Sequence, residues 1–233
     1  MRRIIACAVV LLLAVSDICA QKRNTLKNLP NYDNKTWHFG FSIGANNLGF
    51  RVDRADEFME LSNVYGVDAV KYTGFHVGPL SNLRLNKYMD LRMMFDLSFN
   101  QRDLVYHIVL DKGTMDVRKM QIRSTMLEFP VLIKYKAERI NNYAPYVVAG
   151  GTFRYDLTAG KNPEDEEAVK LNHIDPCISF GAGFDFYLQY FKLAIELRYN
   201  LGLLNTLQPD GGIYTGCLKS LKSNGITLSL HFE

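Results

Sequence analysis

The sequence predicts an all-β fold: an eight-stranded antiparallel transmembrane β-barrel whose strands pair as an up-and-down meander. Three observations favour this fold. Apolar and polar residues alternate in eight segments, and the connections between the segments are alternately long and short. After the N-terminus, no apolar run reaches the length that a membrane-spanning helix needs. A chain that crosses a bilayer with strands must close them into a barrel, because open sheet edges cannot be satisfied in lipid.

Composition narrows the class of protein. The chain has 233 residues, of which 48% are hydrophobic and 22% charged, so we expect a folded chain and not a disordered one. The net charge of +3 is too small to indicate nucleic-acid binding. With 13 tyrosines and 14 phenylalanines against one tryptophan, the aromatic content is compatible with strands.

The N-terminus has the layout of a secretory signal peptide over residues 1–20. Two arginines precede an apolar run over 4–15, which is too short to span a membrane, and Ala20 precedes the expected cleavage point. Cys19 leaves lipidation open as an alternative, although the large Ile18 before it is a poor fit. Residues 21–36 form a polar tail that we expect to hang in the periplasm. Its basic residues are Lys22, Arg23, Lys27 and Lys35.

Residues 37–233 are expected to form the barrel. The eight alternating segments are Trp37–Gly44, Val70–Pro79, Tyr88–Phe99, Thr125–Glu138, Asn142–Leu157, Ile174–Leu188, Phe191–Gly202 and Gly225–Glu233. The second is the weakest, with only Phe75 and Val77 on its apolar face, and the third is the most regular. Several are about ten residues long or more, which suits a tilted transmembrane strand.

The first four segments each carry apolar residues on one face, and the second carries the fewest. These residues are Trp37, Phe39, Phe41 and Ile43, then Phe75 and Val77, then Met89, Leu91, Met93, Phe95, Leu97 and Phe99, and then Leu127, Phe129, Val131, Ile133 and Tyr135. The last four segments repeat the pattern. Their apolar residues are Val147, Ala149, Phe153 and Tyr155, then Ile178, Phe180, Ala182, Phe184 and Phe186, then Leu193, Ile195, Leu197 and Tyr199, and then Ile226, Leu228, Leu230 and Phe232.

Periodicity alone does not say which face lies inside. A secreted lipocalin-like barrel has the same pattern with the faces reversed. Here the apolar face is bulky and aromatic, whereas the other face is small or charged in both signs. Small residues and paired charges can fill a narrow eight-stranded lumen, but they would make a poor ligand cavity. We therefore expect Phe129 and Ile133 to face lipid, and Glu128 and Lys134 to face the lumen.

The connections indicate the topology. The long ones cover about 51–70, 100–122, 158–173 and 203–224, and the short ones about 81–87, 137–142 and 189–190. Outer-membrane barrels have short periplasmic turns and longer surface loops, so both termini are expected on the periplasmic side. The segment around His107 is interpreted as a hairpin that extends the third and fourth strands above the membrane, and not as another spanning strand.

The charged lumen residues are the main candidate site. A polar network is expected from Glu128, Lys134, Arg154, Asp185, Glu196 and Arg198. The favoured role is to plug and stiffen the barrel, with proton or ion passage as the alternative. Because an eight-stranded barrel is too narrow to conduct a folded protein, the chain itself is not expected to be a conduit.

Two cysteines remain after the signal peptide. Cys177 and Cys217 fall near the same rim, so one disulfide is permitted, and two thiols are the alternative. No cysteine and histidine spacing indicates zinc.

We expect no enzyme activity, no cofactor and no small-molecule substrate. The acidic run over 163–168 lacks the spacing of a calcium loop and fits a solvated surface loop. His107 and His173 could both lie outside the membrane, as in lipid-modifying barrels, but no motif connects them.

Three stretches, "LEFPVLIKYK", "PYVVAGGTFRY" and "FGAGFDFYL", resemble strands of the Bacteroidetes outer-membrane β-barrel families. The segment Asn28–Phe50 is similar to the start of the PorT family. That resemblance implies a non-enzymatic outer-membrane component of the type IX secretion system, with other secretion components as partners. An adhesion or structural barrel, whose surface loops bind an extracellular ligand, is the alternative.

Overall fold

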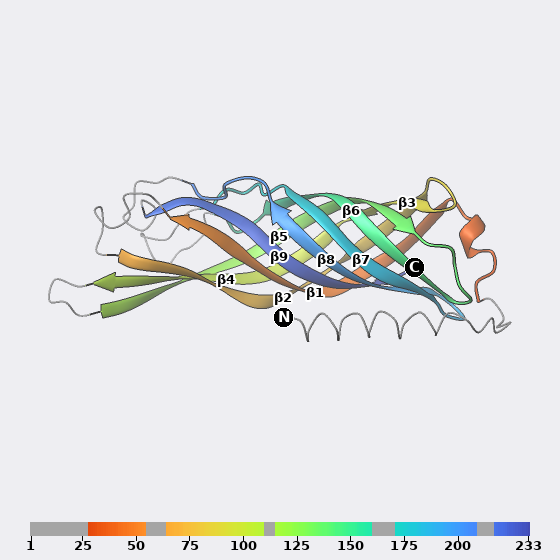
Figure 1. Cartoon of the computed structure of the whole chain (residues 1–233), viewed down its shortest axis with the longest axis horizontal. Coiled ribbons are helices and arrows are strands. Elements are labelled where there is room, and N and C mark those ends of the chain that lie inside the picture. The colour runs from red at the N-terminus through yellow and green to blue at the C-terminus, as the bar shows by residue number, and fades with distance from the viewer. Residues whose placement is uncertain (1–27, 55–63, 110–114, 160–170, 209–216) are drawn as a thin grey trace, which may run out of the picture.

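The computed structural model describes residues 28–54, 64–109, 115–159, 171–208 and 217–233 (Figure 1). A short 3-10 helix, η2 (Tyr32–Asn34), precedes the strands. The strands are β1 (Trp37–Arg54), β2 (Val64–Arg84), β3 (Met89–Met94), β4 (Asp96–Val109), β5 (Met115–Lys136), β6 (Tyr143–Asp156), β7 (Cys177–Tyr187), β8 (Lys192–Gly202) and β9 (Leu218–Phe232). Within the described ranges, no helix is both long and apolar enough to cross a membrane.

The strands close into a ring. β1 pairs antiparallel with β2 on one side and with β9 on the other, and the remaining antiparallel pairings follow the order of the chain, with β3 and β4 both pairing with β2 and with β5. β3 and β4 lie end to end between β2 and β5, so together they occupy one position. The predicted eight-stranded antiparallel meander is therefore confirmed.

Two prolines explain why β3 and β4 are separate. By register, Phe95 between them lies opposite Pro79 of β2, and Met94 at the end of β3 lies opposite Pro130 of β5. Proline has no backbone N–H, so the ladder loses a donor at each of these positions. The Phe95 amide still donates to the Pro79 carbonyl at 3.1 Å, and the register is the same before and after the break.

The two faces of the ring have the predicted orientation. Apolar side chains point outward along the spanning part of every strand, and Phe39 is the clearest case at 72% exposed. The exposed set includes Phe41, Phe75, Phe129, Val131, Ile133, Val147, Phe180, Phe184, Leu197 and Leu228. Polar side chains of the same strands are buried inside, among them Glu128, Lys134 and Arg198. A band of this kind, wrapped around a polar interior, is how a barrel fits into lipid.

Several strands are longer than the sequence predicted. Much of the expected loops over 51–70 and 100–122 is strand, because β1, β2, β4 and β5 continue beyond the apolar band. The predicted hairpin around His107 is confirmed, since Ile108 pairs with Asp116 across β4 and β5. At the left of Figure 1 the β1–β9 pair and the β2–β4–β5 ribbon separate. Pairing between β1 and β2 ends at Leu48 and Tyr72.

The two ends of the barrel differ. We call the end with the short connections and residues 28–36 the turn end, and the opposite end the loop end. At the loop end the interior becomes apolar. A buried cluster there comprises Phe50, Val64, Val67, Leu104, Tyr106, Ile122, Leu171, Leu207, Cys217, Leu218 and Leu221. Burying such side chains typically contributes about 1.5–3 kcal/mol each, which stabilises the part of the barrel that lipid does not surround.

Candidate functional site

The six predicted lumen residues form three buried ion pairs. Glu128 of β5 and Arg154 of β6 are register partners, and their side chains approach to 3.3 Å. The Lys134 ammonium lies 2.6 Å from Asp185 of β7. Glu196 and Arg198 are two residues apart on β8, with 3.5 Å between their charged atoms. Because successive side chains of a strand point to opposite faces, all six side chains lie inside the barrel. The narrow ring then brings opposite charges into contact.

Arg92 joins these pairs, although it was not among the six predicted residues. It is fully buried on β3, where its guanidinium donates to Glu196 at 2.6 Å and to Glu233 at 3.3 Å. The guanidinium also lies 5.4 Å from the centre of the Tyr146 ring. Its place on the polar face of the third predicted segment was the signal that could have found it.

Glu233 gathers a second cluster at the turn end. Its Oε2 accepts hydrogen bonds from Asn82 at 2.6 Å, from Lys192 at 2.8 Å and from the Tyr32 hydroxyl at 2.8 Å. Together with Arg92, these donors surround a buried carboxylate with positive charge and polar hydrogens. The arrangement ties β2, β3, β8 and the segment before β1 to the last residue of the chain.

The N-terminal segment, defined as residues 28–36, packs on the turn end. Asn28 donates from its side chain to the Tyr187 carbonyl at 3.0 Å and from its backbone to Asn142 at 2.9 Å. The Tyr32 ring stacks on His38, with centroids 4.0 Å apart. Burial, and then the Glu233 carboxylate, raise the pKa of the Tyr32 hydroxyl, so it remains a protonated donor.

The predicted periplasmic tail, residues 21–36, is described from residue 28 onward. The described part of residues 21–36 lies against the barrel, because its aromatic and amide side chains find partners at the turn end. Lys35 is exposed there, whereas Lys22, Arg23 and Lys27 lie outside the described residues, as does the predicted signal peptide.

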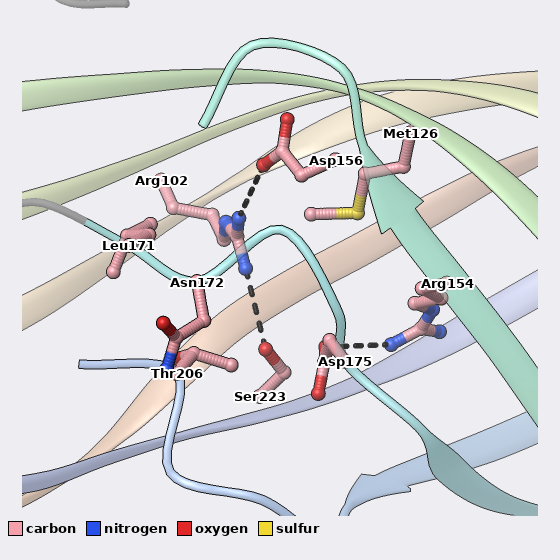
Figure 2. Close-up of a pocket in the computed structure, with 9 residues that line it drawn as sticks. All are labelled: Arg102, Met126, Arg154, Asp156, Leu171, Asn172, Asp175, Thr206 and Ser223. Atoms are coloured by element: carbon pink, nitrogen blue, oxygen red, sulfur yellow. Dashed lines mark hydrogen bonds and ion pairs between the residues drawn. The ribbon is translucent and has the colours of Figure 1, made fainter. Parts of the chain in front are cut away.

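Nearer the loop end, a second arginine cluster closes the lumen (Figure 2). Arg102 lies 3.7 Å from Asp156 and donates to Ser223 at 3.3 Å, and Arg154 lies 3.8 Å from Asp175. The cavity among these side chains is about 10 Å³. That is room for about one water molecule, so this level of the lumen is packed and not open.

Asp96 stands apart from the paired charges. It is 1% exposed, and neither of its carboxylate oxygens has a hydrogen-bond partner among the described residues. Burying a charge without a partner costs free energy, so neutralising such a carboxylate removes that cost. Neutralising one member of a buried ion pair instead leaves the other member charged and unpaired.

We therefore expect Asp96→Asn to leave the free energy of unfolding within about 1 kcal/mol of wild type. The matched change Asp185→Asn should lower it by about 3 kcal/mol, because Lys134 would be left buried and unpaired. Urea unfolding of the barrel in lipid vesicles measures both. Equal losses in the two variants would show that Asp96 has a partner after all.

The permitted disulfide is absent, and Cys177 and Cys217 are both buried thiols. Cys177 is the β7 partner of Gly202, which lies beside Ser223 of β9. Cys217 directly precedes β9 and is six residues from Ser223, which is about 20 Å at strand spacing. Disulfide-bonded cysteines have Cα atoms within about 7 Å, so the two are too far apart. Cys177 instead accepts a hydrogen bond from Arg154 at 3.1 Å.

The two candidate histidines bind different groups. His107 Nε2 lies 3.1 Å from Asp68 across β4 and β2, whereas His173 Nδ1 lies 2.9 Å from the Asp156 carbonyl. In the part of the chain that the structure describes, no cluster of three or more histidine, cysteine, aspartate or glutamate residues could hold a metal ion. The acidic run over 163–168 lies outside the described residues.

Comparison with known proteins settles the class of barrel. The family described as "Outer membrane protein beta-barrel domain" matches residues 19–208. The chain belongs to this family. It is therefore an outer-membrane β-barrel protein, and the polar network described above is the interior of an outer-membrane barrel. No curated protein matches the chain.

Several solved outer-membrane barrels are similar in structure. Neisserial surface protein A is 10% identical, with a TM-score of 0.43 over 84% of this chain and 98% of that one. OprG from Pseudomonas aeruginosa is 12% identical, with a TM-score of 0.45 over 83% and 92%. Ail from Yersinia pestis is 12% identical, with a TM-score of 0.36 over 85% and 98%.

Proposed function

We propose that this outer-membrane barrel is a non-enzymatic component of the type IX secretion system, needed for export of cargo proteins and acting as a partner or assembly factor. The resemblance of Asn28–Phe50 to the start of the PorT family supports the assignment. The filled lumen supports the role: Arg92, Lys134 and Arg154 are buried in the interior with their counter-ions, so cargo would have to pass elsewhere.

The observation that carries this proposal is the place of the N-terminal segment. The stretch that resembles PorT begins with this segment, which is bound to the turn end through Tyr32 and Asn28. In the proposed orientation both termini are periplasmic. The N-terminal segment and the short turns of the turn end then form an ordered surface that faces the periplasm. Such a surface suits contact with other secretion components.

A deletion strain tests the proposal. We expect type IX cargo to accumulate in the periplasm of the deletion strain and to return to the outside when the gene is supplied in trans. A variant with Tyr32→Phe and Asn28→Ala, which should weaken the N-terminal segment and leave the barrel folded, is expected to export less cargo than wild type. Normal cargo export in the deletion strain would contradict the secretion role.

The second candidate function is adhesion. The long extensions of β2, β4 and β5 at the loop end favour it, because they carry exposed side chains such as Val117 at 56% exposed beyond the apolar band. Replacing residues 104–120 with a short turn separates the two functions. Loss of surface binding with normal cargo export would favour adhesion, and the reverse result would favour secretion.

A further inference from the structure

Toward the loop end of β1, β2 and β9, the outward side chains of the barrel change from apolar to basic. On β1, β2 and β9, the outward side chains toward the loop end include Arg51, Lys71 and Lys222. Four residues nearer the middle of β2 and β9, Phe75 and Ile226 are half exposed and belong to the apolar band. Four residues of strand cover about 13 Å, so the cations lie next to the acyl region, at the depth of lipid headgroups.

The three cations are close to one another. Arg51 and Lys222 are direct register partners on β1 and β9, with side chains on the same face. Lys71 Nζ donates to Asn224 at 3.1 Å, and Asn224 is two residues from Lys222 on that face. Like charges directly opposite each other on neighbouring strands destabilise a sheet. A bound anion would remove that cost.

The side-chain stem of Lys71 lies over Gly49 of β1. A Cβ atom at Gly49 would come within 2.4 Å of Lys71 Cγ, so only glycine leaves room for the lysine stem to lie across β1. The stem thereby carries its ammonium group from β2 to β9.

A hollow lies beside the cluster. Above Leu48 and Tyr72, where pairing between β1 and β2 ends, a hollow of about 740 Å³ opens. Its lining residues are Val52, Asp53, Val67, Lys219, Ser220 and Lys222. Asp53, the acidic group in this set, accepts a hydrogen bond from Ser220 at 2.8 Å and lies 3.8 Å from Arg51. Among the described residues, the cations of the hollow and its rim therefore outnumber its carboxylate.

We propose that Arg51, Lys71 and Lys222 bind the phosphate groups of a phosphorylated lipid headgroup in the leaflet at the loop end of the barrel. The apolar band supplies the surface for the acyl chains of the same lipid, and the hollow supplies room for the headgroup. Clusters of lysine and arginine beside a membrane-spanning segment recognise anionic headgroups in this way. The site does not depend on a secretion role.

Lipid binding to the barrel refolded in detergent tests the proposal. The probes are a bisphosphorylated lipid A and its dephosphorylated form with the same acyl chains. We expect native mass spectrometry to show binding of the phosphorylated lipid, and about a hundred-fold loss in the variant with Arg51→Gln, Lys71→Gln and Lys222→Gln. That loss corresponds to about a five-fold decrease in binding affinity for each of the three cations removed near a lipid surface.

The control variant carries Lys35→Gln, Arg84→Gln and Lys87→Gln at the turn end, which removes the same charge from the far side of the band. It should bind the lipid like wild type, and far-UV circular dichroism should show that both variants are folded. Equal binding of the two lipid forms, an equal loss in both variants, or unchanged binding in the first variant would each overturn the proposal. A photocrosslinker at Lys219 that captures an acidic peptide in cells, and no lipid, would also overturn it.

Discussion

Arg92→Met should lower the free energy of unfolding by about 3–5 kcal/mol. Arg92 is the buried cation that both Glu196 and Glu233 contact, at 2.6 Å and 3.3 Å. Methionine has a similar length but no charge, so the packing is largely kept while two buried carboxylates lose a partner. Urea unfolding in lipid vesicles, followed by the mobility shift of the folded barrel on unheated gels, measures the loss.

A second change separates charge from packing in that result. The double variant Arg92→Met with Glu196→Gln should recover part of the loss, because one of the two carboxylates that lose the Arg92 guanidinium is then neutral. Arg84→Met serves as the control, since Arg84 lies at the end of β2 with an exposed side-chain contact to the Asn86 carbonyl. If Arg92→Met had the same free energy of unfolding as wild type, that result would contradict the idea that the lumen charges stabilise the barrel.

Phe180→Arg should lower the free energy of unfolding by about 2–4 kcal/mol. Phe180 is 46% exposed on the outer face of β7, in the middle of the apolar band, where an arginine would meet the hydrocarbon of the bilayer. The cost of a charge on the lipid face falls to about 0–1 kcal/mol near the interfaces.

Tyr190→Arg is the matched control for that variant. Tyr190 is 83% exposed in the turn between β7 and β8, so it is more exposed than Phe180 but lies at the end of the barrel. We expect this variant to lose no more than about 1 kcal/mol. The same loss at both positions would mean that the outer face of β7 is not in contact with lipid.

The fold was predictable because lipid imposes a strict pattern. In a segment such as Thr125–Glu138, each outward residue must be apolar, so Phe129 and Ile133 reveal the strand and its faces without any knowledge of their neighbours. Where β4 and β5 leave the lipid, this requirement ends, and Gln121 and Lys119 can occupy the outer face. The alternation therefore disappears although the strand continues, which is why loops were predicted there.

The site was predictable only in part, for a different reason. Alternation places Glu128 and Lys134 inside, but it does not say which side chains meet across a closed ring. Glu128 pairs with its register neighbour Arg154, whereas Lys134 reaches past β6 to Asp185. The contact between Tyr32 and Glu233 joins residues 201 positions apart, and it exists because β9 closes onto β1. Such contacts depend on the size and register of the ring.

The central claim is that the apolar face of the strands lies against lipid and the charged face inside. Trp37 is the only tryptophan, so Trp37→Phe gives a background without this fluorophore. Single tryptophans at positions 129, 131, 133 and 135 would then be placed in vesicles whose acyl chains carry bromine, which quenches tryptophan on contact. Strong quenching at all four positions, varying with depth along the strand, is the predicted result. No quenching at any of them in the folded barrel would mean that this face is enclosed, and would contradict the account.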